Sequence, residues 1–156
     1  MKELAAKGVE VVGVSGDSVR TQQLFKKVHE LNYTLLADED GAVARKFGVP
    51  LRKGGPFKTK IDGVEEILIR GVTPSRWSFV IGKDGKIAAV NRKVNAAKES
   101  KAILKIIESL PVDLELGDAV PDFEVRDDTD KAWRWKDHVG KKTLVLFFFP
   151  AALTGG

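Results

Sequence analysis

The sequence predicts an α/β fold in which helices flank a central mixed β-sheet. Short β-branched runs such as residues 8–15 are typical of buried strands. These runs alternate with segments such as 19–31, in which apolar residues recur at helical spacing. The run from Thr143 to Phe149 is apolar on both faces, which indicates a central strand in a sheet covered on both sides.

The first 48 residues predict two strand-then-helix units in succession. In chain order these are a strand over 8–15, a helix over 19–31, a short strand over 34–37 and a short helix over 42–47. Ser18 is a good N-cap for the first helix, and Gly48 ends the second. We expect the buried face of the first helix to carry its periodic apolar residues, namely Leu24, Phe25, Val28 and Leu31.

The middle of the chain predicts hairpins and then a helix. Residues 49–63 are rich in glycine and proline and read as a loop, but Asp62-Gly63 is a hairpin signal that would pair 57–61 with 65–70. A buried strand over 77–81 and a tight turn precede a returning strand over 87–90. An amphipathic helix is expected over 97–110, ended by Pro111.

Residues 111–116 are the expected linker between a first portion, 1–110, and a last portion, 117–156. The last portion predicts a strand over 122–125 and a turn at 127–130 before the apolar strand. Trp133 and Trp135 are two residues apart and would share one face of a strand, as core residues or as a partner surface.

Composition limits the class of protein. A chain of 156 residues fits one domain with a real core. No apolar run approaches the roughly 20 residues of a membrane span, and the charged start is unlike a secretory signal, so we expect a cytoplasmic protein without a membrane partner. The net charge of +4 comes from scattered lysines and arginines, so no nucleic-acid partner is expected.

Three polar groups suggest sites but have simpler interpretations. The segment 15–18 lies between a strand and a helix, yet it lacks a phosphate-loop pattern, so capping is favoured. The two histidines, His29 and His138, have no cysteine to join them, so no metal or cofactor is expected. The acidic run 38–40 reads as a solvated turn, because no calcium-loop pattern follows it.

Three segments carry a resemblance to the peroxiredoxins. Residues 8–18 resemble the strand and turn that follow the active-site helix of that family, and 76–87 resemble its arginine-bearing strand and hairpin. Residues 117–123 resemble its opening, which here leads to the run from Phe149 through Pro150 to Thr154. The similarity is greatest to the bacterioferritin-comigratory and alkyl-hydroperoxide-reductase (thiol-specific antioxidant) branches.

The resemblance implies a thioredoxin-like fold whose segments occur in rotated order. The opening of the family lies at Gly117, and its middle lies at residue 1. The chain would then be circularly permuted relative to the family, a slice of a tandem two-domain protein, or a truncated reading frame. The two portions together would form one thioredoxin-like domain, or parts of two.

The resemblance also implies a chemistry and its residues. Arg76 would be the arginine that lowers the pKa of a peroxidatic thiol, Thr154 would supply a hydroxyl, and Pro150 would shield the site. The implied partners are a peroxide and a thiol reductant such as thioredoxin. The chain has no cysteine, so it is expected to be inactive as given, and to form a homo-oligomer or a swapped dimer.

Two other functions stay open. One is a non-catalytic binding or assembly module of thioredoxin-like fold. The other is a flavodoxin-like nucleotide binder, which rests only on the alternation of strands and helices and would require a phosphate loop that the sequence lacks.

Overall fold

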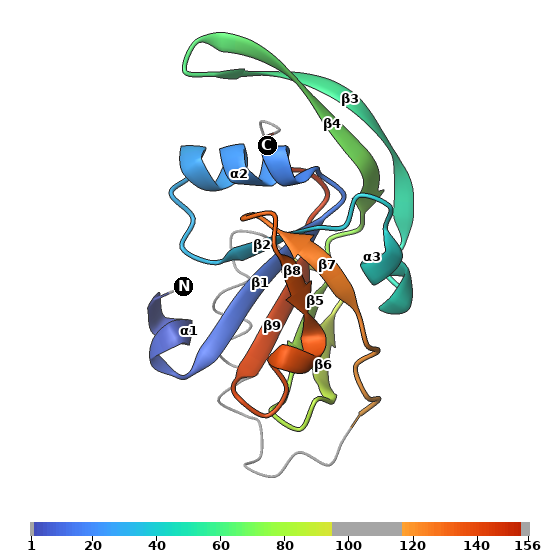
Figure 1. Ribbon diagram of the computed structural model, residues 1–156. Coiled ribbons are helices and arrows are strands. Elements are labelled where there is room, and N and C mark those ends of the chain that lie inside the picture. Colours follow the sequence, from blue (N-terminus) through green and yellow to red (C-terminus); the bar gives the residue numbers. More distant parts are fainter. Residues whose placement is uncertain (1, 95–116, 154–156) are drawn as a thin grey trace.

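The computed structural model describes residues 2–94 and 117–153, and shows a seven-stranded mixed sheet with a long two-stranded hairpin beside it (Figure 1). The order of strands in the sheet is β6-β5-β9-β1-β2-β7-β8. Its strands are β1 (Val9–Ser15), β2 (Thr34–Ala37), β5 (Ser78–Ile81), β6 (Ile87–Asn91), β7 (Glu124–Asp127), β8 (Ala132–Arg134) and β9 (Thr143–Phe148). The helices are α1 (Lys2–Ala6), α2 (Val19–Val28) and α3 (Ala42–Lys46), with a 3-10 turn η1 (Trp135–Asp137) after β8. The predicted mixed α/β sheet is therefore confirmed.

Strand β9 lies in the middle of the sheet, as its sequence predicts. It is parallel to β1 and antiparallel to β5. Side chains alternate across the sheet, so Leu144, Leu146 and Phe148 face one side while Val145 and Phe147 face the other. Both sides are covered, because Leu146 and Val145 are both fully buried.

An aromatic cluster fills one side of the sheet. Phe47, which follows α3, contacts Phe79, Phe123 and Phe148 with ring centroids 5.0, 5.7 and 5.8 Å away. Trp133 stacks on Phe123 at 5.5 Å, and both Trp133 and Trp135 are at least 94% buried. These tryptophans are core residues, so the alternative that they form a partner surface was wrong. They also do not share a strand, because β8 ends at Arg134.

Helix α2 begins where the sequence predicts and ends three residues early. The Ser18 side chain accepts a hydrogen bond from the Thr21 N–H, which confirms the N-cap. The fully buried residues of α2 are Thr21 and Gln22, whereas Val28 is 46% exposed, so the predicted apolar face was wrong in part. Gln22 is buried because its Nε2 donates to the Ser15 hydroxyl at 2.7 Å and to the Leu36 carbonyl at 3.1 Å.

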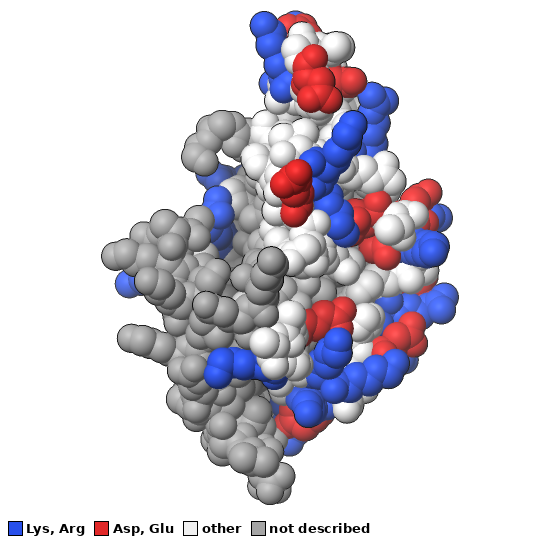
Figure 2. Space-filling view, turned by 90° about the vertical axis from the view of Figure 1, so that its left-hand side faces the viewer, with Lys and Arg blue, Asp and Glu red and all other residues white. Residues whose placement is uncertain are grey.

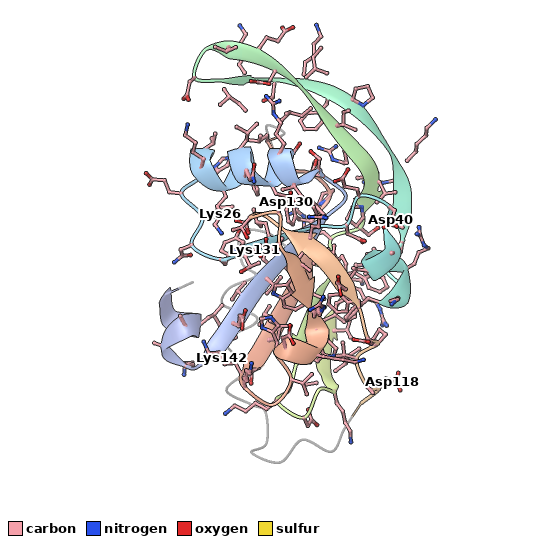
Figure 3. All side chains as sticks on the ribbon, viewed as in Figure 1. Lys26, Asp40, Asp118, Asp130, Lys131 and Lys142 are labelled. Carbon is pink, nitrogen blue, oxygen red and sulfur yellow. The ribbon has the colours of Figure 1, made fainter. Side chains whose placement is uncertain are left out.

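An ion pair joins α2 to the turn between β7 and β8. Lys26 Nζ lies 2.7 Å from Asp128 Oδ2, and Asp128 Oδ1 accepts the Leu35 N–H at 2.9 Å. Figure 3 shows Lys26 on the underside of α2, above the turn that carries Asp130 and Lys131. The buried Asp128 therefore connects a helix, a central strand and an edge hairpin.

The hairpin is longer than the sequence predicts. Its strands are β3 (Leu51–Ile61) and β4 (Val64–Pro74), joined by the predicted Asp62-Gly63 turn, and it curves over α2 (Figure 1). The first half of β3 contains Gly54, Gly55 and Pro56, residues that are depleted in strands, and for this reason the sequence indicated a loop. Pro56 is accommodated because only one edge of β3 is paired.

The root of the hairpin contacts the end of β1 closely. The Gly71 N–H donates to the Gly16 carbonyl at 2.8 Å, and an isolated bridge joins Asp17 to Arg70. A Cβ atom on Gly16 would lie 2.1 Å from the Val72 carbonyl oxygen, so the two backbones meet only because glycine has no side chain.

Two predicted segments fall on residues outside the described ranges. They are the helix over 97–110 and the linker over 111–116. Within residues 2–94 and 117–153, no helix is long and apolar enough to cross a membrane.

Candidate functional site

A pocket of about 430 Å³ lies where β9 ends. It is lined by Phe25, His29, Leu31, Tyr33, Arg76, Phe147, Phe149, Pro150, Ala151 and Leu153. A second hollow of about 310 Å³ shares Tyr33 with it and continues toward the start of β1. Among the described residues, the lining of the first pocket thus combines an aromatic wall with Arg76 and His29 and includes no acidic side chain.

Arg76 reaches this pocket because of the register between β5 and β9. Ser78 pairs with Phe147 in that antiparallel ladder, so the same register places Arg76 level with Phe149. The Phe148 N–H donates to the Trp77 carbonyl at 2.7 Å, which keeps the two segments paired up to this point. Arg76 is exposed, and no side chain that the structure describes is bonded to its guanidinium.

The structure thus brings two of the three sequence-predicted site residues to one pocket. Arg76 and Pro150 both line it. Thr154 lies outside the described residues. A guanidinium that has no bonded side chain among the described residues and lies beside an apolar wall is suited to hold an oxygen on which negative charge develops.

The loop that follows β9 is held by hydrogen bonds to a buried acid. The Ala152 N–H donates to Asp17 Oδ2 at 2.9 Å, and the Ser15 hydroxyl donates to the same oxygen at 2.8 Å. Arg70 Nε lies 3.0 Å from Asp17 Oδ1. Asp17 is fully buried, so this carboxylate is stabilised by these donors and not by water.

This arrangement around Asp17 is not among the sequence-based predictions. The segment 15–18 was interpreted as a cap, which is correct for Ser18 but leaves Asp17 without a role. A charged residue next to a buried strand was the one available signal. Arg70 is 53 residues away, and nothing local links it to Asp17.

Two titratable side chains, Tyr33 and His29, line the pocket beside its aromatic residues. Burial raises the pKa of Tyr33, so its phenol stays protonated at neutral pH. The His29 ring contacts Phe25 edge-on, with centroids 4.9 Å apart. Within the described ranges, no cluster of three or more histidine, cysteine or acidic side chains has the arrangement of a metal site.

One face of the molecule mixes charges of both signs. Figure 2 shows lysine and arginine interspersed with aspartate and glutamate, with uncharged surface between them. Several of these charges are paired, as in the Arg20–Glu66 contact of 3.0 Å between α2 and the hairpin.

Comparison with known proteins agrees with these features. The sequence model of the AhpC/TSA family matches residues 1–90, which is more than half of the chain. The chain belongs to the AhpC/TSA family. The mixed sheet with few helices agrees with the thioredoxin-like α/β fold of the AhpC/TSA family.

Curated relatives carry peroxiredoxin names. The chain is 38% identical over 92 residues to a peroxiredoxin bcp of Coxiella burnetii, a match that covers 59% of this chain and 54% of the relative. It is 33% identical over 104 residues to a chloroplastic peroxiredoxin Q of Sedum lineare, covering 66% of this chain and 47% of that protein. A chloroplastic peroxiredoxin Q of Oryza sativa subsp. japonica is 32% identical over 104 residues, with 66% and 41% covered. No solved structure gives a significant match.

The AhpC/TSA match has two limits. The chain spans about half the length of the curated relatives that it matches. The family match ends at residue 90, so it does not include Gly117 to Thr154, and the rotated order stays a prediction.

Proposed function

We propose that the pocket beside Arg76 and Pro150 is the peroxide-binding part of a thiol peroxidase site. The parent activity would be the thiol-dependent reduction of hydrogen peroxide and alkyl hydroperoxides. The observation that carries this proposal is the meeting of Arg76 and Pro150 at one apolar pocket in a chain of the AhpC/TSA family. The cytoplasmic location, and thioredoxin or another thiol as reductant, are parts of the same proposal.

The chemistry requires a thiolate that attacks one peroxide oxygen. A sulfur–oxygen bond forms as the O–O bond breaks, and the leaving hydroxide or alkoxide takes up a proton. Arg76 would stabilise the negative charge on the leaving oxygen, and the Thr154 hydroxyl would donate to the peroxide. A second thiol would then condense with the resulting sulfenic acid to form a disulfide, with release of water, and a further thiol reductant would reduce that disulfide.

This chain alone lacks the nucleophile, because none of its 156 residues is a cysteine. We infer that the reaction needs a thiolate from outside these residues. The same observation favours a second candidate function, a non-catalytic binding or assembly module that keeps the fold without the thiol.

The test is to supply the thiol. Two proteins are compared. The first is the 156-residue chain, and the second is the same chain continued after Gly156 by a cysteine and a designed amphipathic helix. Consumption of hydrogen peroxide is measured with dithiothreitol as the reductant. We expect the first protein to be inactive and the second to be active, and Arg76→Met to lower its kcat/KM by about 100-fold, the typical effect of removing one oxyanion donor.

A matched control is Arg52→Met, which removes an exposed arginine of β3 outside the pocket and should leave the rate unchanged. A folded extended chain without peroxide consumption, or equal losses in the two variants, would favour the module. The gene offers an independent check: a cysteine codon after the Gly156 codon supports the peroxidase, whereas a stop codon supports the module.

A further inference from the structure

Asp17 connects three segments that are far apart in the sequence. It accepts hydrogen bonds from Ser15 in β1, from Arg70 in β4 and from the backbone of Ala152 in the loop after β9. All of these contacts are 3.0 Å or shorter, and the carboxylate is fully buried. Loss of any one donor leaves a buried charge less well satisfied, so the three segments are coupled through Asp17.

Arg70 is itself held in one place by the hairpin. Its guanidinium lies over the Phe57 ring, 4.6 Å from the centroid, and its side chain is only 12% exposed. Arg70 Nη2 is buried without a partner, so Asp17 is the group that balances this cation. The Phe57 ring and the paired β3–β4 backbone therefore decide where the guanidinium meets Asp17.

A second contact reaches the same loop from the other hairpin strand. The Thr59 hydroxyl of β3 donates to the Leu153 carbonyl at 3.4 Å. Leu153 has φ of +56°, a conformation that costs a leucine free energy and persists only when neighbouring contacts hold it. Both strands of the hairpin thus contact the loop from 150 to 153, one directly and one through Asp17.

We propose that the β3–β4 hairpin sets the conformation of the loop after β9, with Asp17 and Arg70 as positioning residues. Pro150 and Ala151 line the same pocket as Arg76, so a displaced loop changes the wall of that pocket. The consequence for peroxide binding rests on the proposed function, whereas the mechanical coupling of hairpin and loop does not.

The test follows the Ala152 amide in the 156-residue chain by hydrogen exchange and by its proton chemical shift. Arg70 does not touch Ala152, so Arg70→Met reports coupling through Asp17. We expect Ala152 exchange to become about tenfold faster relative to the Val145 amide in β9, because a hydrogen bond to a well-held charged group is weakened. The Ala152 amide proton should also move upfield. Arg70→Lys, which keeps the cation, should restore part of the protection.

The matched control is Arg20→Met, which removes the ion pair from α2 to Glu66 of the hairpin but does not reach Asp17. It should leave the ratio of Ala152 to Val145 exchange unchanged. Equal ratios in Arg70→Met and Arg20→Met, or an effect of Arg70→Met that Val145 shares in full, would overturn the proposal.

Thr59→Val keeps the proposal testable if Arg70→Met does not fold. It removes only the hydroxyl contact to Leu153, and we expect Ala152 exchange to become several-fold faster without a change at Val145. An unchanged ratio in a folded Thr59→Val variant would count against the hairpin's role. None of these measurements uses peroxide, so a failed peroxidase assay leaves their outcome intact.

Discussion

Replacing Gly16 with alanine tests whether the hairpin root is held by direct backbone contact. The new Cβ would lie 2.1 Å from the Val72 carbonyl oxygen, 2.7 Å from Val72 Cγ2 and 2.8 Å from the Val72 carbonyl carbon. Two of these atoms are backbone, so a rotamer change cannot relieve the overlap and β4 must move by about 1 Å or more. The same movement lengthens the 2.8 Å hydrogen bond from Gly71 to Gly16.

The magnitude follows from these two effects. Overpacking a tight contact costs about 1–3 kcal/mol, and a lost backbone hydrogen bond costs about 1 kcal/mol. We therefore expect Gly16→Ala to lower the free energy of unfolding by about 2–4 kcal/mol, measured by urea denaturation with the slope checked for constancy. Gly55→Ala is the matched control: a Cβ there meets no atom within 4 Å, and its effect should stay within about 1 kcal/mol of zero. Equal midpoints for the two variants would refute the reasoning.

Four further predictions concern an ion pair, the pH dependence of stability and association. Lys26→Met should lower the free energy of unfolding by about 1–2 kcal/mol, because it leaves the buried Asp128 without its ion-pair partner. The loss is moderate because Lys26 itself is partly solvated. A double-mutant cycle with Asp128→Asn measures the coupling between the two side chains, and additive effects would contradict this prediction. Burial raises the pKa of Asp38, so the folded state binds the carboxyl proton more tightly than the unfolded state does. Stability therefore falls as pH rises above the ordinary carboxyl pKa of about 3.9. Asp38→Asn should remove this fall in urea denaturation curves recorded at a series of pH values. For Asp127, burial pushes the pKa upward, but hydrogen bonds from its own turn outweigh burial and lower the pKa. Stability is therefore lost as pH falls below the ordinary carboxyl pKa. Asp127→Asn should remove this loss, a change opposite in sign to that of Asp38→Asn. Finally, the apolar pocket wall leads us to expect self-association of the isolated chain in light scattering at micromolar concentration, and a sharp, reversible melt of a dilute monomer would count against this.

The strands and caps that were predicted correctly are those set by local chemistry. The β-branched run before Ser15, the N-cap at Ser18 and the turn at Asp62-Gly63 each act within a few residues, so the sequence alone locates them. The apolar run ending in Phe148 also reveals its central position, because a strand covered on both faces has no polar side.

The errors occurred where distant contacts outweigh local preference. Gln22 is buried because the Ser15 hydroxyl and the Leu36 carbonyl receive its amide hydrogens, and neither partner is visible in the helical pattern. The first half of β3 is a strand despite Gly54, Gly55 and Pro56, since pairing with β4 compensates for their low strand preference.

The candidate site was accessible from the sequence only in part. The resemblance led to Arg76 and Pro150, which the structure brings to one pocket, whereas Thr154 lies outside the described residues. Asp17 and Arg70 were not anticipated, because their pairing depends on how the hairpin folds back over the end of β1.

Pro56 has a consequence for how the protein behaves at high concentration. Residues 69–71 of β4 are bonded to residues 16–18, so β3 presents the open edge of the hairpin. A long unpaired edge is a template onto which another chain can add a strand, the first step toward fibrils. Proline offers no N–H to an incoming strand, and the exposed Lys60 repels a like-charged copy. Pro56, one of the residues that indicated a loop in the sequence, thus makes this edge a poor template for an added strand.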